Sequence, residues 1–345
     1  MTVPKVITFG ELMLRLSPPG FERLLQSPML VATFGGGEAN VAVGLANLGG
    51  VDSVYITALP KNAIGDAAIR ALRAEGVRTD RIVRSGDRVG IYFAETGASQ
   101  RASTVLYDRA NSAISLMPPD AVNWAEEMKG AAWFHVTGIT PALGERGSAS
   151  TARALAAAKK AGARVSVDLN FRKKLWSEAK AQEVMGPLMR DVDLVIANEE
   201  DLQSVLGVHV PGTDVTAGQL NLQGFREAAE RVTRDFGPKQ VAITLRESIS
   251  ASDNGWSAVF WDATNSMMYQ SQRYNVRLVD RIGGGDSFAA GLIYGLVTGR
   301  SQEDSLRFAV AASALKQTIP GDFSRVSLAE VEALVGGDAS GRVRR

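Results

Sequence analysis

The sequence contains no cysteine and only two histidines among its 345 residues. The lack of cysteine excludes disulfides, thiolate catalysis, iron–sulfur clusters and zinc sites with cysteine ligands. Two histidines are too few for a multi-histidine metal site. Lysine and arginine number 38 and aspartate and glutamate 37, so the net charge of +1 lacks the basic excess of a nucleic-acid binder. A net charge close to zero does not exclude a local anion-binding site.

Long hydrophobic runs are missing as well. The longest, residues 288–297, is much shorter than the roughly 20 residues that a membrane helix needs. The first residues lack the basic leader and apolar core of a signal peptide. We therefore expect a cytoplasmic protein with neither a nucleic-acid nor a membrane partner.

Short apolar runs alternate with longer helical patterns along the chain. Strands are predicted at residues 6–9, 54–57, 133–136, 164–168, 194–197 and 241–244. Helices are predicted at residues 39–48, 66–75, 148–161, 178–190, 225–236, 286–298, 303–316 and 328–335. This alternation predicts an α/β fold, in which a mostly parallel sheet is flanked by helices on both faces.

Two segments depart from the alternation of strands and helices. Residues from Met13 onward alternate between apolar and polar, and residues 88–109 have the pattern of a β-hairpin around Gly97. We expect them to pair into a small β-sheet lid with one apolar face, which either the substrate cleft or a partner subunit would cover. The second possibility would give a homo-oligomer. The predicted boundaries are 11–35 and 88–112 for the lid, 1–10, 36–87 and 113–335 for the core, and 336–345 for a disordered tail.

Polar residues follow several of the predicted strands. In open parallel sheets, ligands bind beyond the carboxyl ends of the strands. The residues at these ends are Gly10-Glu11, Asp168 to Asn170, Asn198 to Asp201 and Leu245-Arg246. They predict one cleft, although any one of them could also serve as a helix cap.

The strongest local motif is residues 280–291, where Gly283, Gly284 and Gly285 precede Asp286 and a helix of small residues. Glycines let successive N–H groups point into one concavity, and the helix N-terminus adds partial positive charge. Such a nest stabilises a phosphoryl group in transfer, and Asp286 could take the proton of an attacking hydroxyl. The alternative is a glycine turn with Asp286 as a plain N-cap. The other common phosphate cradles, the P-loop and the dinucleotide fingerprint, are absent.

A second glycine motif spans residues 35–49 and opens another helix of small residues. Gly36 and Gly37 would allow a ligand to approach the backbone closely, and Asn40 could hydrogen-bond a ligand hydroxyl. Tight packing of the helix on the sheet explains the small residues equally well.

Together, the two glycine motifs resemble the paired signatures of the PfkB (ribokinase-like) family of carbohydrate kinases. The resemblance covers about residues 5–335 and implies a ribokinase-like core with a β lid, ATP and Mg²⁺ as cofactors, and a sugar substrate. Three departures stand out: Arg281-Ile282 replaces a usual small pair, residues 60–62 interrupt a segment where glycine is common, and Asn198-x-x-Asp201 replaces Asn-x-x-Glu.

Residues 90–93, 105–113, 167–176 and 319–323 resemble the 2-keto-3-deoxygluconate kinase branch of that family. A carboxylated sugar acid suits planar guanidinium groups, and Arg109 and Arg172 are placed to reach the cleft. Tyr92 and Tyr107 could contact the same substrate. The alternatives are salt bridges for the two arginines and packing within the lid for the two tyrosines.

The resemblance implies ATP-dependent phosphorylation of 2-keto-3-deoxygluconate at the C6 hydroxyl. Asp286 would be the general base, and the Gly283–Gly285 amides would stabilise the phosphoryl group. Gly36, Gly37, Asn40, Tyr92, Tyr107, Arg109 and Arg172 would bind substrate. Asn198, Leu245, Arg246, Gly283 and Gly285 would bind nucleotide. Asn198 and Asp201 would position Mg²⁺ through water, and residues 309–314 are further candidates for adenine. Other PfkB kinases, for fructose, ribose, tagatose phosphate or nucleosides, and a non-catalytic sugar-acid sensor remain alternatives.

Overall fold

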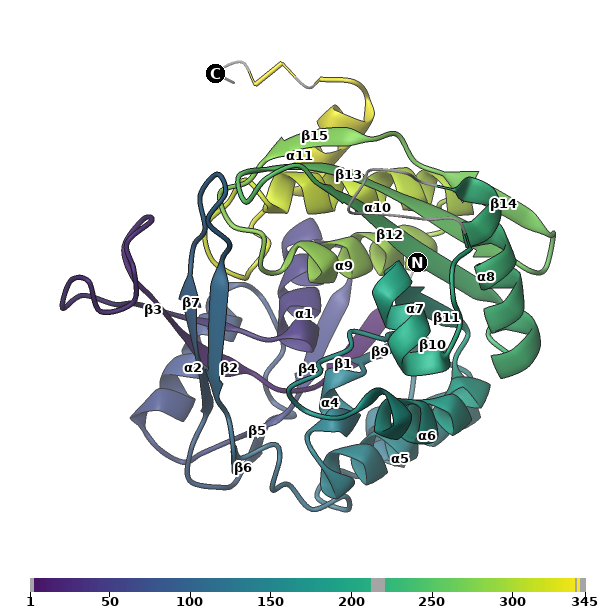
Figure 1. The fold of residues 1–345 in the computed structure, drawn as a ribbon. Coiled ribbons are helices and arrows are strands. Elements are labelled where there is room, and N and C mark those ends of the chain that lie inside the picture. Colours follow the sequence, from purple (N-terminus) through teal and green to yellow (C-terminus); the bar gives the residue numbers. More distant parts are fainter. Residues whose placement is uncertain (1–2, 212–220, 339, 342–345) are drawn as a thin grey trace.

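The computed structural model describes residues 3–211, 221–338 and 340–341. A nine-stranded sheet crosses the centre of the molecule (Figure 1), in the order β14-β13-β12-β11-β10-β9-β1-β4 with β15 beside β13. The parallel strands are β1 (Lys5–Phe9), β4 (Asp52–Ile56), β9 (Ala131–Thr137), β10 (Arg164–Asp168), β11 (Leu194–Ala197) and β12 (Gln240–Ser248). The antiparallel strands are β13 (Asp253–Asp262), β14 (Met267–Gln270) and β15 (Tyr274–Arg277). The predicted α/β class is confirmed.

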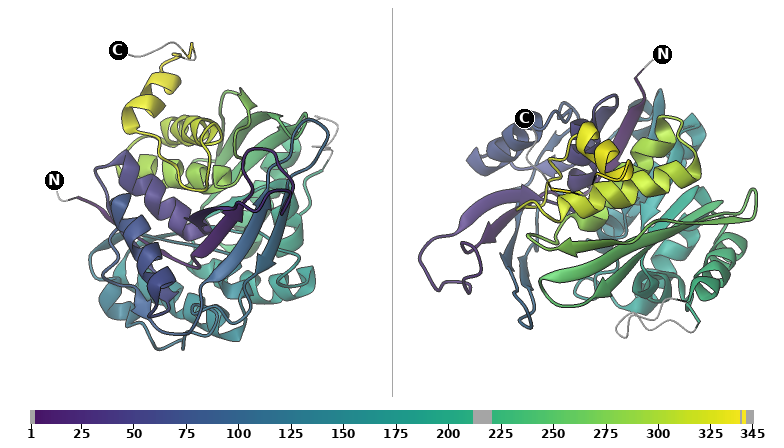
Figure 2. Two further views of the ribbon diagram at one scale, coloured as in Figure 1. Left: turned by 90° about the vertical axis from the view of Figure 1, so that its left-hand side faces the viewer. Right: turned by 90° about the horizontal axis from the view of Figure 1, so that it is seen from above.

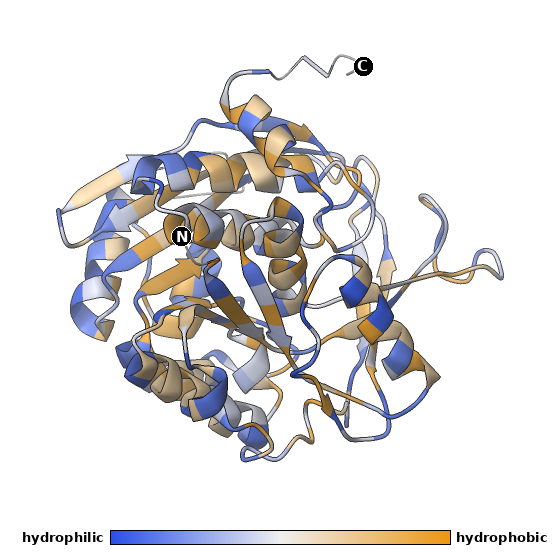
Figure 3. Ribbon diagram, turned by 180° about the vertical axis from the view of Figure 1, so that it is seen from behind, coloured by the Kyte–Doolittle hydropathy of each residue, from blue (hydrophilic) through white to orange (hydrophobic). Residues whose placement is uncertain are grey.

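Helices cover both faces of this sheet (Figure 1). One face packs against α1 (Gly37–Leu48), α9 (Gly284–Val297), α10 (Gln302–Lys316) and α11 (Leu328–Val335). The other packs against α5 (Glu145–Ala161), α6 (Glu178–Leu188), α7 (Glu199–Leu206) and α8 (Leu222–Phe236). Helix α2 (Ala63–Ala74) lies beside α1, and α3 (Trp124–Glu127) and α4 (Ile139–Ala142) are short. Figure 3 shows hydrophobic strands at the centre and hydrophilic turns on the outer helices.

A separate four-stranded sheet stands beside the core (Figure 2). Its order is β3 (Val31–Gly35), β2 (Met13–Ser17), β7 (Gly90–Glu95) and β8 (Thr104–Asp108). Strands β7 and β8 form the predicted hairpin, and β2, which belongs to the other insertion, pairs with β7 in parallel. A two-stranded sheet joins β5 (Ala58–Leu59) to β6 (Val83–Arg84). We call the four-stranded sheet the lid; the exact domain boundaries stay a prediction.

The described part of the chain contains no helix long and apolar enough to cross a bilayer. Of the predicted tail, residues 339 and 342–345 lie outside the described residues, so its disorder stays a prediction.

Candidate active site

The glycine motif of residues 283–286 forms the start of α9. Gly283 has φ 82°, a left-handed conformation that favours glycine, and a Cβ on it would lie 2.2 Å from the carbonyl oxygen of Asp322. The Gly284 amide donates to the carbonyl of Arg281 at 3.2 Å, so it serves the turn itself. The backbone amides in the first turn of a helix have no partner within the helix. Gly285 lies in the first turn of α9, so its amide is one of them. The three glycines thus give a helix N-terminus that is open to an anion.

Asp286 lies in the first turn of α9, next to these amides. Its Oδ2 accepts a hydrogen bond of 2.7 Å from Nδ2 of Asn40, which belongs to α1. Burial raises the pKa of Asp286 to about 6, although the Asn40 hydrogen bond and the charges of Arg172 and Lys316 oppose the rise. A carboxyl group with this pKa is ionised at neutral pH and still basic enough to accept a proton.

The start of α1 is built for close approach. A Cβ on Gly36 would lie 1.9 Å from the carbonyl oxygen of Glu11, and one on Gly44 would lie 2.8 Å from Cβ of Ala290 in α9. The amide of Gly36 also donates to Oδ1 of Asn40 at 3.2 Å. The small residues of this motif therefore pack two helices together, and the same packing carries Asn40 to Asp286.

Glu38 anchors this helix start, and the sequence analysis missed it. Its Oε1 accepts hydrogen bonds from the amide and hydroxyl of Thr137, both 2.9 Å, and from the hydroxyl of Thr140 at 2.7 Å. Burial raises the pKa of Glu38 to about 7. Gly10 leaves it room, since a Cβ there would lie 2.0 Å from Oε2 of Glu38. The sequence did offer one signal for this residue, because Glu38 is the single acidic residue in a segment of small residues.

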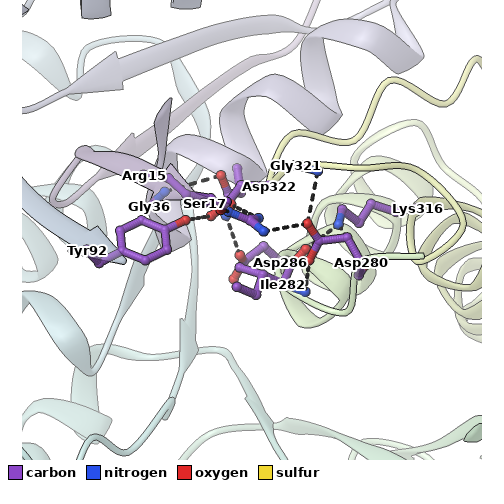
Figure 4. Close-up of polar contacts among 11 residues, drawn as sticks. Arg15, Ser17, Gly36, Tyr92, Asp280, Ile282, Asp286, Lys316, Gly321 and Asp322 are labelled. Carbon is purple, nitrogen blue, oxygen red and sulfur yellow. Dashed lines mark hydrogen bonds and ion pairs between the residues drawn. The ribbon is translucent and has the colours of Figure 1, made fainter. Parts of the chain in front are cut away.

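A buried ionic cluster joins the lid to the loop before the glycine motif (Figure 4). Arg15 of β2 pairs with Asp280 at 2.7 Å and with Asp322 at 2.8 Å. The hydroxyl of Tyr92 in β7 donates to Oδ2 of Asp322 at 2.6 Å. Tyr92 is buried and already hydrogen-bonded, as the packing alternative expected, although its side chain also lines the cavity described below.

Lys316, at the end of α10, was not singled out from the sequence. Its buried ammonium donates to the carbonyl of Asp280 at 3.1 Å and to that of Ile282 (Figure 4). Burial lowers the pKa of Lys316, while the charges of Asp280, Asp322 and Asp286 raise it. A charged donor therefore holds the backbone that leads into Gly283.

The two arginines predicted to bind a carboxylate have different surroundings. Arg109 donates through Nε to Glu11 at 2.8 Å and through Nη2 to the same oxygen, and its guanidinium lies 5.3 Å from the Tyr107 ring centre. Arg172 donates to the carbonyl of Phe171 at 3.0 Å, and no carboxylate of the described residues lies within ion-pair distance of it. Arg109 thus has the salt bridge that the alternative expected, whereas Arg172 has no close ion pair and interacts at longer range with the charges of Asp168, Asp201 and Asp286.

Asn198 and Asp201 form a capping box at the start of α7. Oδ1 of Asn198 accepts from the Asp201 amide at 2.7 Å, and Oδ1 of Asp201 accepts from the Phe171 amide at 2.9 Å. Burial raises the pKa of Asp201. No group of three or more metal-binding side chains occurs among the described residues. That Asn198 and Asp201 position Mg²⁺ through water stays a prediction.

One cavity of about 470 Å³ connects these features beneath the lid and beyond the strand ends. The predicted site residues that line it are Gly36, Gly37, Asn40, Tyr92, Tyr107, Arg109, Arg172, Asn198, Asp201, Arg246, Gly283, Gly284, Gly285 and Asp286. Leu245 and residues 309–314 do not, because Leu245 faces the core on one side of the sheet and residues 309–314 pack against its other side. Their placement does not support the predicted adenine contacts.

The cavity wall also includes residues to which the sequence analysis gave no role in binding or catalysis. Asp168, at the end of β10, is buried there, and burial raises its pKa with help from the charges of Asp201 and Asp286. Arg281 and Asp322 line it too. Carboxylates and guanidinium groups thus share one cleft, as a site for a polar, charged ligand requires.

Comparison with known proteins agrees with this geometry. The sequence model of the pfkB family of carbohydrate kinases matches residues 3–324. The chain is 34% identical to a 2-dehydro-3-deoxygalactonokinase of Haloferax volcanii, over 97% of this chain and 98% of the relative. It is 27% identical to a 2-dehydro-3-deoxygluconokinase of Bacillus subtilis, over 92% and 90%. The crystal structure of a 2-dehydro-3-deoxygluconokinase from Thermotoga maritima is similar over 97% of this chain and all of that one, with 49% identity and a TM-score of 0.92.

Proposed function

Because the chain belongs to the pfkB family of carbohydrate kinases, we propose that it phosphorylates 2-keto-3-deoxygluconate at the C6 hydroxyl, with ATP as donor. The observation that carries this substrate class is Arg172, whose guanidinium lines the cavity and forms no close ion pair with a described carboxylate, although its charge lowers the pKa of Asp168, Asp201 and Asp286. A planar guanidinium binds a carboxylate through two parallel hydrogen bonds. The names of the relatives, which are sugar-acid kinases, support the same class.

In the proposed reaction, the Asp286 carboxylate accepts the proton of the C6 hydroxyl while the hydroxyl oxygen bonds to the γ-phosphorus. The bond from that phosphorus to the bridging oxygen breaks and leaves ADP. Amides at the start of α9 stabilise the charge on the transferring group. The products are ADP, a 6-phosphate of the sugar acid and a proton.

The donor enters the cleft as MgATP. Mg²⁺ would neutralise part of the phosphate charge, and Asn198 and Asp201 at the start of α7 would position it through water. The lid excludes water, which would compete as phosphoryl acceptor.

The substrate is tested by following ATP consumption with 2-keto-3-deoxygluconate, 2-keto-3-deoxygalactonate, fructose, ribose and adenosine. We expect turnover with the keto-deoxy acids, and Arg172→Ala raises KM for them at least tenfold. The matched control is Lys173→Ala, which removes the neighbouring exposed cation and leaves KM within twofold. Preference for a neutral sugar, or an unchanged KM in R172A, would contradict the proposed substrate class.

The panel also separates the alternatives. The two acids differ at one hydroxyl, and the ratio of their kcat/KM values decides between the two names borne by the relatives. Fructose or ribose turnover would indicate another branch of the family, and binding without any turnover would indicate a sensor.

A further inference from the structure

The loop that follows β10, residues 169–172, ends at Arg172 and is held along its backbone. The amide of Asn170 donates to Oδ1 of Asp168 at 3.2 Å. Asn170 has φ 38°, a conformation that residues other than glycine rarely adopt. Such a conformation persists only where the surrounding structure imposes it. The path of this loop is therefore set by its contacts with other parts of the chain.

The next amide of the loop is held by helix α7. Oδ1 of Asp201 accepts a hydrogen bond from the amide of Phe171 at 2.9 Å, across 30 positions of sequence. The carbonyl of the same Phe171 accepts a hydrogen bond from Nη1 of Arg172 at 3.0 Å. Phe171 thus connects a carboxylate of α7 to a guanidinium that lines the cavity.

Asp201 is itself firmly placed. It is the third residue of α7, its side chain is buried, and its amide donates to Oδ1 of Asn198 at 2.7 Å. Burial raises the pKa of Asp201, whereas the Phe171 amide and the charge of Arg172 lower it. Both of these neighbours therefore favour the ionised carboxylate, which is the better hydrogen-bond acceptor.

A guanidinium that is placed before its ligand arrives binds that ligand more tightly than a mobile one. Ordering a loop and a long side chain on binding costs conformational entropy, and existing support removes that cost. Two parallel hydrogen bonds to a carboxylate also require the guanidinium plane to have the right orientation. The two contacts of Phe171 supply both conditions for Arg172.

We propose that Asp201 is a positioning residue of the sugar-acid site, which fixes through the Phe171 amide the loop that presents Arg172 to the substrate carboxylate. The inference rests on the proposed function, in which Arg172 binds that carboxylate. It adds to the role predicted for Asp201 toward Mg²⁺, because a carboxylate accepts several hydrogen bonds. The Phe171 amide uses Oδ1, and Oδ2 has a contact of 3.5 Å with the amide of Asn198.

The test measures the binding of 2-keto-3-deoxygluconate by calorimetry without ATP and Mg²⁺, so that a role toward the ion does not contribute. We expect Asp201→Ala to weaken binding at least tenfold, because the Phe171 amide loses its acceptor. Asp201→Asn loses the charge but keeps an acceptor oxygen, so its affinity should stay within threefold of the native value. In an Arg172→Ala background, Asp201→Ala should weaken binding no more than twofold further, since the group that it positions is gone.

A second readout follows the loop itself. Hydrogen–deuterium exchange of residues 168–176, measured without any ligand, should be faster in D201A and unchanged in D201N. Asp201→Glu keeps the charge and a capping box, as Glu330 does in α11, but its carboxylate is one methylene further from the backbone. We expect D201E to fold and to bind the sugar acid at least threefold more weakly, and it decides the test if D201A does not fold.

The matched control is Glu330→Ala, which removes the corresponding carboxylate from the capping box of α11, outside the cavity. It should lower thermal stability but leave sugar-acid binding within twofold and the exchange of residues 168–176 unchanged. A comparable loss of binding in E330A would show that general destabilisation is the cause, and would overturn the assignment.

Native affinity in D201A would overturn the assignment, and so would equal losses in D201A and D201N, which would indicate an effect of charge alone. Native exchange of the loop in D201A would overturn it whichever sugar is the substrate. Faster exchange in D201A, in a protein that binds no sugar acid, would contradict the proposed function and leave the positioning of the loop by Asp201 standing.

Discussion

The side-chain amide of Asn40 donates a hydrogen bond of 2.7 Å to the carboxylate of Asp286, across 246 positions of sequence. The two residues come from the two glycine motifs, and the contact exists because α1 and α9 pack closely at Gly44 and Ala290. The amide of Asn40 is itself fixed by the backbone of Gly36. The base is therefore oriented by a helix from the opposite end of the chain, and four predictions follow from this arrangement and its surroundings.

The first prediction concerns pH. The pKa of Asp286 is raised to about 6, mainly by burial, and only the ionised form accepts a proton. With 2-keto-3-deoxygluconate, kcat/KM should rise about tenfold per pH unit below pH 6 and level off above it. Removing the Asn40 donor takes away a contact that lowers this pKa, so Asn40→Ala should move the acid limb to higher pH. Asn47→Ala is the control, because Asn47 lies on the same helix but binds Glu75 and Ser324. An acid limb at the same pH in N40A would contradict the assignment.

The second prediction concerns Lys316, a positioning residue. Lys316→Met removes the charged donor of two carbonyls in the loop before Gly283, and an unsatisfied buried group costs about 1–3 kcal/mol. We expect a lower free energy of unfolding in urea. We also expect at least a tenfold lower kcat with the sugar-acid KM within threefold, since the loop holds the transferring group. Unchanged kcat in a destabilised K316M protein would reduce Lys316 to a structural role.

The third prediction concerns the outer face of the lid. Since Tyr92, Ala94, Val105 and Tyr107 line the cavity, strand alternation turns the apolar residues between them outward. Leu14 is paired with Ile91, Leu16 with Phe93, and Phe93 with Leu106, so one apolar patch crosses three strands. We expect this face to join two copies of the chain in solution. Sedimentation should show an oligomer that Leu106→Asp dissociates and that Leu222→Asp, an exposed leucine of α8, does not. A monomeric native protein would contradict the prediction.

Much of the fold followed from the sequence because its signals are local. Residues 164–168 and 194–197 are apolar runs between helical patterns, and the observed strands have these same bounds. The antiparallel extension was missed, because residues 253–262 form a nearly continuous buried run without a clear period. Helix α7 was missed because it has only eight residues, although its cap, Asn198, was predicted in the cleft and does line the cavity.

Only part of the site could be predicted from the sequence, because some of its features are local and others depend on tertiary packing. Glycine motifs and strand ends are visible locally, so Asn40 and Asp286 could be named. Which charged side chains pair is decided by tertiary packing. The salt bridge between Arg109 and Glu11 and the roles of Arg15 and Lys316 could therefore not be predicted from the sequence. The side chain of Leu245 lies in the core, because residues alternate along a strand and its neighbour Arg246 faces the cavity.

The fourth prediction tests the central claim, that Asp286 is the base of a sugar-acid kinase. The measurement is the rate of ATP consumption with 2-keto-3-deoxygluconate by the native protein and by Asp286→Asn, with the exposed Asp120→Asn as control. Loss of a general base lowers the rate by about 10²–10⁴-fold. The account predicts a loss of that size in D286N, native turnover in D120N, and unchanged ATP binding in both. Substantial turnover in D286N, or none in the native protein with any substrate of the panel, would contradict it.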